Sequence, residues 1–285
     1  MSYSTLNLRH DGNVLRVTIS NPPINTMTVK MVEELFHLAG GLLNDTSVKV
    51  VLFDSADPDF FIAHFDLNDF VSAASDPSKA SKYPDINVVQ SLIQCWQALP
   101  QVTIGKVDGR CRGGGLEFLL GLHMRFASCE SLFCFPEASL GFLACGSGVT
   151  RMALSVGPAR ALEVVLSARD FSAEEAERYG FINRALPANE LDGYVDDLVE
   201  RLGKRSREVI AINREVLTRV QAPFVDSFFA GLAAENDGLR ASLASPELQS
   251  LIAAMISQGQ EREVERDLPA SITMLLAAQQ KESDR

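Results

Sequence analysis

The stretch Gly109-Arg110-Cys111-Arg112-Gly113-Gly114-Gly115-Leu116-Glu117 joins a predicted strand to a predicted helix, and the rest of the chain is organised around it. The apolar run at residues 102–107 predicts a buried strand, and the run at 116–122 predicts a helix. Successive glycines are favoured where the backbone approaches another group closely or adopts angles that a β-carbon forbids. A helix beginning near Gly114 would direct unpaired N–H groups at an anionic group. The alternative is a close packing contact between helix and strand, with Glu117 in solvent.

The composition limits the classes of partner. The 285 residues suffice for one large domain, or for a core with an appendage. Hydrophobic residues make up 46% and charged residues 22%, which is ordinary for a globular protein. The net charge of -11 argues against a nucleic-acid partner, which requires a basic face. An anionic ligand would need a local basic patch, for which Lys106, Arg110 and Arg112 are candidates; three separate surface cations are the alternative.

The cysteines and the N-terminus give expectations about location. The five cysteines form no CxxC pair and have no metal-ligand spacing with the four histidines, so we expect no metal site. Reduced thiols indicate a cytoplasmic setting. The first residues do not resemble a secretory leader, and no apolar run approaches the roughly 18–20 residues of a membrane span. We therefore expect a cytoplasmic protein that contacts no membrane.

Strand and helix patterns alternate up to about residue 190, and only helical patterns follow. The predicted strands are 7–10, 14–20, 48–53, 102–107, 124–127, 132–135 and 181–186. The predicted helices in this part are 28–43, 85–99, 116–122, 147–156, 159–166 and one capped by Ser172 with Glu175. Later breaks are expected near Arg205, Pro223, Ser245 and Pro269. This order predicts an α/β core over 1–195 and a helical domain over 196–285.

Glu117 and Glu137 are the candidate acid–base pair. Glu137 follows Pro136 among apolar neighbours, so desolvation should raise its pKa toward the range useful for general acid–base catalysis. Two carboxyl groups that share a site separate their pKa values, so that one can hold a proton while the other accepts one. The alternative is that each glutamate is solvated or caps its own helix. His64 and His123 are interpreted as core or edge histidines.

Five segments, in this order along the chain, resemble the enoyl-CoA hydratase/isomerase (crotonase) superfamily, and the chain is identified as a divergent member. The segments are Asn21-Pro22-Pro23-Ile24-Asn25-Thr26-Met27, Phe61-Ile62-Ala63-His64-Phe65-Asp66-Leu67, residues 107–117, Phe135-Pro136-Glu137 with Leu140-Gly141, and residues 172–186. The resemblance implies a spiral of ββα units, with a C-terminal helical domain that covers the pocket and takes part in oligomerisation. It also implies a homotrimer or a dimer of trimers.

The resemblance assigns roles to particular residues. The backbone N–H groups of Phe65 and Gly114 would donate to the carbonyl oxygen of an acyl-CoA thioester, forming an oxyanion hole. Backbone groups of Ala63 and Leu67 would hold the adenine end of coenzyme A. The remaining residues expected in the coenzyme A site are His64, Asp66 and Gly113. Coenzyme A would be part of the substrate, and no separate cofactor is expected.

Glu117 and Glu137 match the two glutamates with which hydratases of this family hold a water molecule. One would take a proton from the water that attacks the β-carbon, and the other would deliver a proton to the α-carbon. The resemblance therefore implies a hydro-lyase that converts a 2-enoyl-CoA into a 3-hydroxyacyl-CoA. The alternatives are double-bond isomerisation, C–C cleavage or thioester hydrolysis on a CoA thioester, or a catalytically quiet binding or scaffold protein.

The chain departs from the family pattern at several places. His64-Phe65 replaces a usual Gly-Ala, so we expect the bulk to narrow or reshape the pocket; His64 would contact the thioester region or the pantetheine arm, or only fill space. Ala144 and Cys145 replace a usual Pro-Gly turn, which we expect to alter the support of Glu137. The C-terminal part lacks the usual basic run, so no contact to the CoA phosphates is carried over. The aromatic candidates for the pocket wall, most of them expected in the core, are Phe60, Phe61, Phe65, Phe70, Phe142 and Trp96.

Overall fold

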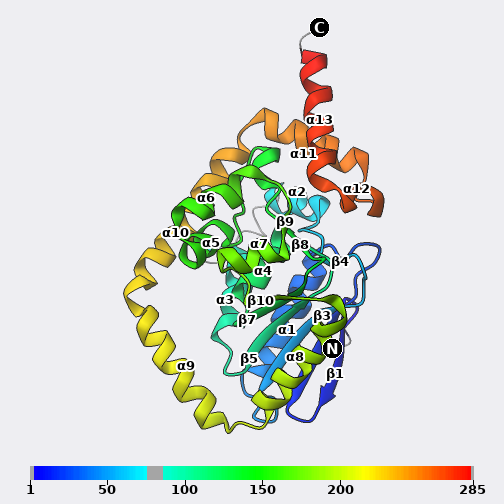
Figure 1. Cartoon of the computed structure of the whole chain (residues 1–285). Helices are drawn as coiled ribbons and strands as arrows, with labels where there is room; N and C mark the ends of the chain where they lie inside the picture. Colours follow the sequence, from blue (N-terminus) through cyan, green and yellow to red (C-terminus); the bar gives the residue numbers. More distant parts are fainter. Residues whose placement is uncertain (1–2, 76–85, 284–285) are drawn as a thin grey trace.

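A computed structural model describes residues 3–75 and 86–283, and two β-sheets form its centre (Figure 1). The large sheet has the strand order β1-β2-β3-β5-β7-β10, and the small sheet has the order β4-β6-β8-β9. The strands of the large sheet are β1 (Leu6–Asp11), β2 (Val14–Ile19), β3 (Val50–Ser55), β5 (Val102–Val107), β7 (Met124–Ser128) and β10 (Arg184–Leu186). Those of the small sheet are β4 (Phe60–Ile62), β6 (Arg110–Arg112), β8 (Leu132–Cys134) and β9 (Phe171–Ser172).

Three repeats of strand, strand and helix build the core. In each repeat the first strand joins the large sheet and the second joins the small sheet, so β3, β5 and β7 are parallel neighbours, as are β4, β6 and β8. The helices that follow are α2 (Leu67–Ser75) and α3 (Val88–Ala98), then α4 (Gly114–Gly121), then α5 (Gly148–Val156) after a 3₁₀ turn, η2 (Glu137–Leu140). The predicted α/β spiral of ββα units is confirmed.

Most predicted elements occur within two or three residues of their expected bounds, including α1 (Val29–Leu42), α6 (Pro158–Ser167) and α7 (Ala173–Tyr179). The sequence did not indicate α2 or the short strands β4, β6 and β9. None of these strands exceeds three residues, which is too short for an alternating pattern to be visible. The expected start of the second helix at residue 85 lies outside the described residues, and α3 begins at Val88.

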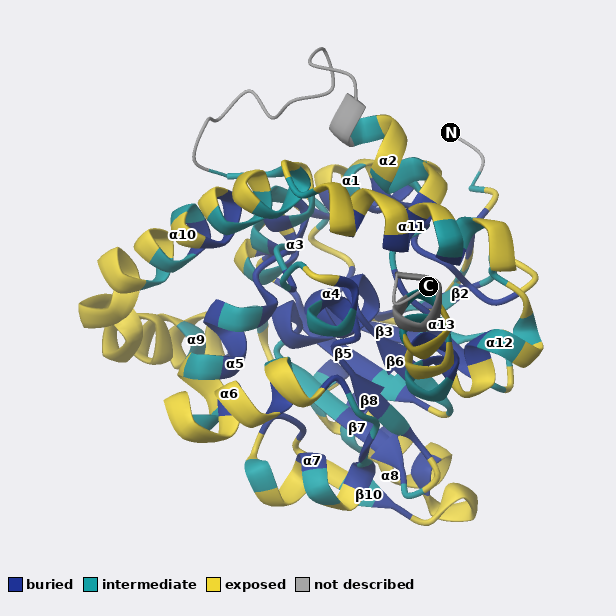
Figure 2. Cartoon of the chain, turned by 90° about the horizontal axis from the view of Figure 1, so that it is seen from above, coloured by how far each residue is buried: buried dark blue, intermediate teal, exposed yellow. Residues whose placement is uncertain are grey.

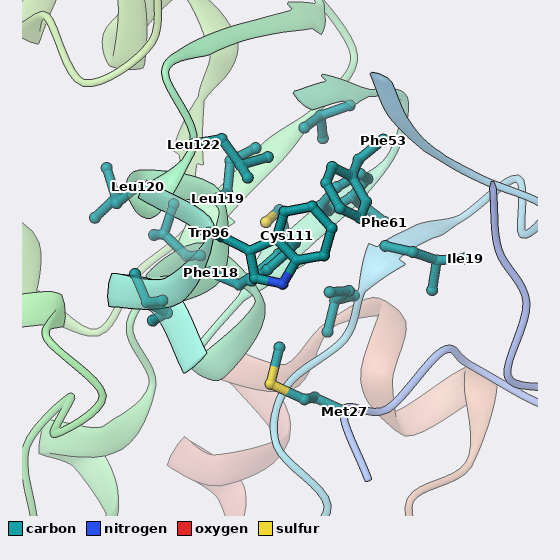
Figure 3. Close-up of a cluster of buried hydrophobic side chains, with 14 of the residues drawn as sticks. Ile19, Met27, Phe53, Phe61, Trp96, Cys111, Phe118, Leu119, Leu120 and Leu122 are labelled. Carbon is teal, nitrogen blue, oxygen red and sulfur yellow. The ribbon is translucent and has the colours of Figure 1, made fainter. Parts of the chain in front are cut away.

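The main core lies between the large sheet and α4 (Figures 2 and 3). Every residue of α4 is buried. The ring of Phe53 from β3 makes edge contacts with Trp96 of α3 at 4.9 Å between centroids and with Phe118 of α4 at 5.2 Å. Burial of such large rings stabilises the packing of both helices on the sheet. The helix that follows the glycine stretch is therefore fixed in place by the centre of the protein.

From Ala188 onward the described chain is helical: α8 (Ala188–Gly203), α9 (Arg207–Gln221), η3 (Ala222–Phe224), α10 (Val225–Leu243), α11 (Pro246–Gln258), α12 (Arg262–Arg266) and α13 (Leu268–Ser283). Figure 1 shows α9 along the outer edge of the molecule, while α11, α12 and α13 gather near α2. No helix in the described ranges is long and apolar enough to cross a membrane.

The helix breaks and the domain boundary of the C-terminal part compare with the prediction as follows. The break expected near Pro269 is confirmed at Asp267, between α12 and α13, and the proline lies in the first turn of α13, where its missing N–H costs no helical hydrogen bond. A further break, at Gly259 between α11 and α12, was not expected. The expected domain boundary after residue 195 falls inside α8, which packs against β3 and β7. The division into two domains stays a prediction.

Candidate active site

A cavity of about 400 Å³ lies where α2, α3, α4 and η2 meet the C-terminal helices. Among the predicted site residues, it is lined by His64, Phe65, Leu67, Gly114, Glu117 and Glu137. Ala63, Asp66 and Gly113 are not part of its lining. The rest of the wall is mostly apolar and includes Phe70, Val88, Val89, Leu140, Phe142, Leu143, Leu239, Leu243, Met255, Leu268 and Ile272. The fold thus brings both candidate glutamates and both candidate backbone donors to one cavity.

The backbone N–H groups of Phe65 and Gly114 lie close together. A β-carbon added at Gly114 would be 3.2 Å from the β-carbon of Phe65 and 3.5 Å from its backbone nitrogen. The residues on either side of Phe65 pair with Met27: the Met27 N–H donates to the His64 carbonyl, and the Asp66 N–H donates to the Met27 carbonyl. In such a bridge the N–H of Phe65 itself points away from Met27. Gly114 is the first residue of α4 and has no helical acceptor for its N–H. This pair of donors can bind a carbonyl oxygen.

The three glycines serve different purposes. Gly113 has a φ of 47°, in the left-handed region that favours glycine, and its N–H donates to the Cys134 carbonyl at 3.0 Å. A β-carbon at Gly115 would lie 2.7 Å from the Ile62 carbonyl oxygen, so this glycine permits close packing of α4 on β4. The packing contact is present at Gly115, but the solvent-exposed Glu117 of that alternative is wrong, because the side chain is buried. The helix start at Gly114 is buried as well and lines the cavity.

Glu117 is buried and held by the turn before α5. Its Oε1 accepts hydrogen bonds from the N–H groups of Gly146 at 2.6 Å and Gly148 at 2.9 Å. Burial and the charges of Glu137 and Glu235 raise the pKa of Glu117 well above its ordinary value, although the two N–H donors act in the opposite direction. The amide groups that follow Ala144 and Cys145 point at Glu117, and the effect of these two residues on the support of Glu137 stays a prediction.

Glu137 begins η2 and is also buried. In the described part of the chain its Oε2 has no hydrogen-bond partner. Burial raises the pKa of Glu137 to about 7, against the opposing charge of His64. Since each carboxylate raises the cost of ionising the other, the pair favours one shared proton near neutral pH. Such a pair can deliver one proton and accept another.

His64 is bonded through both ring nitrogens. Nδ1 lies 2.8 Å from the Phe65 carbonyl oxygen, and Nε2 lies 3.0 Å from a carboxylate oxygen of Glu265. Both partners are acceptors, so the ring must carry two N–H groups and a positive charge. Burial alone would lower the pKa of His64, but the charge of Glu265 and these hydrogen bonds raise it to about 9. The sequence did not reveal this partner, which lies on α12.

The segment from Gln260 to Arg266 lies over the loop expected to bind coenzyme A. The Leu67 N–H donates to Gln260 Oε1 at 3.1 Å, and Gln260 Nε2 donates to an Asp66 carboxylate oxygen at 2.9 Å. The Ala63 N–H donates to the Asn25 carbonyl at 3.3 Å. The two N–H groups expected at the adenine end are therefore engaged within the protein. For Ala63 and Leu67 to hold adenine, the base would have to bind other backbone groups of these residues, or displace Gln260 from the Leu67 N–H.

The basic patch expected beside the glycines does not form. Lys106 lies between Asp54 and Asp192, at 3.5 and 2.6 Å. Arg112 is fully buried and bonds Asp170 through two nitrogens. Arg110 donates to the Arg266 carbonyl at 2.7 Å. All three cations therefore interact with groups of the protein itself, and they do not form a shared site for an anion.

The remaining candidates divide between pocket and core. Phe65, Phe70 and Phe142 line the cavity, and the last two stack at 5.4 Å between centroids. Phe60, Phe61 and Trp96 are fully buried in the core, as expected for most of the set. Among the described residues, no cluster of histidine, cysteine or acidic side chains has the arrangement to hold a metal ion.

Sequence reasoning missed the polar contribution of the C-terminal helices. Asn236 of α10 lines the cavity and hydrogen-bonds Asn87 at the start of α3 at 2.8 Å. Glu235, beside it, is buried and lies near Glu117. The adjacent polar residues Glu235 and Asn236 in the amphipathic helix α10 were the available signal in the sequence. Only the packing of α10 on α5 and α3 places them beside the cavity.

Comparisons with known proteins identify the family and the fold. The family model described as enoyl-CoA hydratase/isomerase matches residues 9–250. Short-chain-enoyl-CoA hydratase of Clostridium acetobutylicum is 23% identical over 259 residues, which are 90% of this chain and 97% of that protein. Carnitinyl-CoA dehydratase of Escherichia coli is 28% identical over 225 residues, 79% of this chain and 84% of that protein. The crystal structure of a candidate enoyl-CoA hydratase from Streptomyces avermitilis has a TM-score of 0.89 at 37% identity, covering 97% of this chain and all of that one.

Proposed function

The chain belongs to the enoyl-CoA hydratase/isomerase family, and from this premise we propose that it hydrates a 2-enoyl-CoA to a 3-hydroxyacyl-CoA. The observation that carries the proposal is the presence of two buried carboxyl groups, Glu117 and Glu137, in one cavity beside two backbone donors. An isomerase can work with a single acid–base group that moves one proton, whereas addition of water uses one group to accept a proton and one to supply it. No cofactor is needed, because coenzyme A arrives as part of the substrate.

The reaction begins with the thioester carbonyl oxygen accepting hydrogen bonds from the N–H groups of Phe65 and Gly114. These fixed donors, with the start of α4, stabilise the negative charge that develops as the enolate forms. A water held by Glu117 and Glu137 attacks the β-carbon. One carboxylate takes the proton of that water, and the other carboxyl group gives its proton to the α-carbon, so that H and OH are added across the double bond.

The cavity wall supports an apolar acyl group. About 400 Å³ lies in the usual range for small-molecule sites. The stacked rings of Phe70 and Phe142, with Met255 and Leu268 nearby, provide contact surface without polar partners for the acyl chain. We therefore propose medium-length or aryl 2-enoyl groups as substrates, in preference to a short acyl group that leaves much of the cavity unfilled.

The test is the loss of absorbance of the enoyl-thioester band with short, medium and aryl 2-enoyl-CoA substrates. We expect hydration by the wild type, fastest with the medium and aryl compounds, and none at a comparable rate by Glu117→Gln or Glu137→Gln. Tight acyl-CoA binding without hydration would favour isomerisation, C–C cleavage or thioester hydrolysis. Absence of both binding and hydration would leave the catalytically quiet binding or scaffold protein.

We also propose that copies of this chain assemble, as a homotrimer or a dimer of trimers. The support is an exposed apolar surface on α9 and the start of α10, formed by Val209, Ile212, Val216, Leu217, Val220, Phe224, Val225 and Phe229. Contiguous apolar surface of this extent is characteristic of contacts between proteins. A second copy is the partner that the family resemblance implies, and α9 lies at the edge of the molecule where such a copy has access (Figures 1 and 2).

A further inference from the structure

We propose that Glu235 of α10 is a positioning residue for Glu117, because the two carboxylates hold alternate N–H groups of the turn at Gly146, Ser147 and Gly148. The inference rests on the proposed hydration, in which Glu117 acts on water. It assigns to the C-terminal helices a part in orienting the acid–base pair, in addition to covering the pocket.

The turn is pinned from both sides. The N–H groups of Gly146 and Gly148 donate to Glu117 Oε1, at 2.6 and 2.9 Å. The N–H of Ser147, between them, donates to Glu235 Oε2 at 2.9 Å. Ser147 has a φ of 92°, which a residue with a β-carbon adopts only when its surroundings impose it. The contact with Glu235 is one of those surroundings, and it turns the neighbouring amides toward Glu117.

Glu235 also caps α5. Its Oε1 accepts from the N–H of Thr150 at 2.8 Å, in the first turn of that helix. The Ser147 side chain makes no capping hydrogen bond and accepts instead from Arg151 Nε at 2.9 Å. A carboxylate at a helix N-terminus satisfies free N–H groups and interacts favourably with the dipole. Loss of Glu235 would therefore release the turn and the start of α5 together.

A buried network fixes Glu235 itself, which is 3% exposed. Gln90 of α3 donates to Glu235 Oε2 at 3.0 Å and to the Cys145 carbonyl at 2.9 Å. Asn236 donates to Gln90 Oε1 at 3.0 Å. The chain is thus held by α3 at Cys145, just before the turn, and by α10 at Ser147, the centre of the turn. A shift of either helix changes the position of the N–H groups that donate to Glu117.

The charge of Glu235 acts on the same group. The groups that face Glu117 are Glu137 of η2, Glu235 of α10, Cys145 of the turn and Arg151 of α5. Glu235 is one of the two negative charges that raise the pKa of Glu117. Its replacement by the neutral, equally long glutamine removes that charge while keeping one acceptor oxygen, so the pKa of Glu117 should fall and the pH profile of activity should move to lower pH.

The test compares Glu235→Gln and Glu235→Ala with Glu34→Gln. Glu34 is a matched control: it is fully buried and accepts hydrogen bonds from the backbone N–H groups of Ser4 and Thr5, but it lies on α1 outside the cavity lining. We expect kcat to fall about 10- to 100-fold in the Glu235 variants, with KM changed less than twofold. The pH profile of activity should shift to lower pH in Glu235→Gln. Glu34→Gln should lose stability and keep wild-type kcat and pH profile.

Two outcomes overturn the proposal. One is a folded Glu235→Ala enzyme with wild-type kcat and pH profile. The other is a crystal structure of Glu235→Ala in which the turn and the Glu117 carboxylate superpose on the wild type, while the proposal expects both to be displaced. The crystallographic result decides the positioning role even if the wild type hydrates no substrate, so failure of the proposed reaction is recognised separately.

Discussion

The imidazole of His64 lies 3.0 Å from the carboxylate of Glu265, a residue 201 positions further along the chain. Arg112 also donates to the backbone carbonyl of Glu265, so this residue is held by a side-chain and a main-chain contact. The pair fixes α12 to the loop that carries Phe65, one of the two candidate oxyanion donors. A buried ion pair of this kind makes the geometry of the site dependent on the charge of one histidine.

The first prediction concerns stability against pH. The pKa of His64 is raised from 6.5 to about 9, so its contribution to the free energy of unfolding is fully present below about pH 6.5 and is lost as the pH rises to about 9. The shift corresponds to about 3 kcal/mol. Urea unfolding at pH 6, 7.5 and 9 measures this. His64→Gln should lose the part of this dependence that His64 contributes and leave the part due to the raised pKa values of Glu117 and Glu137, while the exposed His10→Gln should retain all of it. Equal slopes in both variants would contradict the assignment.

The second prediction concerns the two glutamates. Glu117→Gln and Glu137→Gln should each lower kcat at least about 100-fold, because each removes one of two proton-transfer groups. The affinity of both variants for a saturated acyl-CoA, measured by calorimetry, should be nearly the same as that of the wild type. If either variant keeps more than a tenth of the wild-type kcat, that residue does not transfer a proton in the slow step.

The third prediction is the pH dependence of the wild-type reaction. Burial raises the pKa of Glu137 to about 7 and the pKa of Glu117 well above its ordinary value, so the pair loses its first proton near neutral pH. We expect kcat/KM to rise through about pH 7, where one proton remains, and to fall again at higher pH once both groups are ionised. A flat profile from pH 5 to 9 would show that the pair does not titrate in the free enzyme.

The fourth prediction tests the oxyanion donors. In Gly114→Ala the new β-carbon would lie 3.2 Å from the β-carbon of Phe65, so the two donors must move apart. The N–H of residue 114 is retained but displaced, so we expect kcat to fall toward the about 10²–10³-fold that complete loss of one such donor costs. Gly41→Ala is the control, since this exposed glycine of α1 has open space around it. Comparable kcat for Gly114→Ala and Gly41→Ala would remove Gly114 from the proposed mechanism.

The fifth prediction addresses assembly. Ile212 and Val216 are 61% and 56% exposed and lie one helical turn apart on α9. Replacing both with aspartate places charge on the proposed contact and should shift the sedimentation coefficient toward that of a monomer. Thr218→Asp is the control: this exposed residue lies on the opposite side of α9 at 100° per residue, so the added charge should leave the assembly intact. Sedimentation of the wild type as a monomer would disprove the proposed contact itself.

Local sequence signals predicted the elements that depend on near neighbours. Thr28 caps α1 through a hydrogen bond to the Met31 N–H, and Ser172 and Glu175 form the expected capping box of α7. Both contacts join residues three positions apart, so the sequence contains all their determinants. The strand β6, in contrast, lies within the glycine stretch and was not predicted, because it is defined by its ladders with β4 and β8.

The sequence by itself determined the longer strands and helices of the α/β core, the glycine-rich start of α4 and the identity of the two candidate glutamates. These follow from local propensity, apolar spacing and the order of motifs, which are properties of short stretches of chain. Only the tertiary structure decided that the turn at Gly146 supports Glu117, that His64 is paired with Glu265, and that Glu235 holds Ser147. Each of these depends on packing between segments far apart in sequence, and the energy of a buried charge or N–H depends on which partner that packing provides.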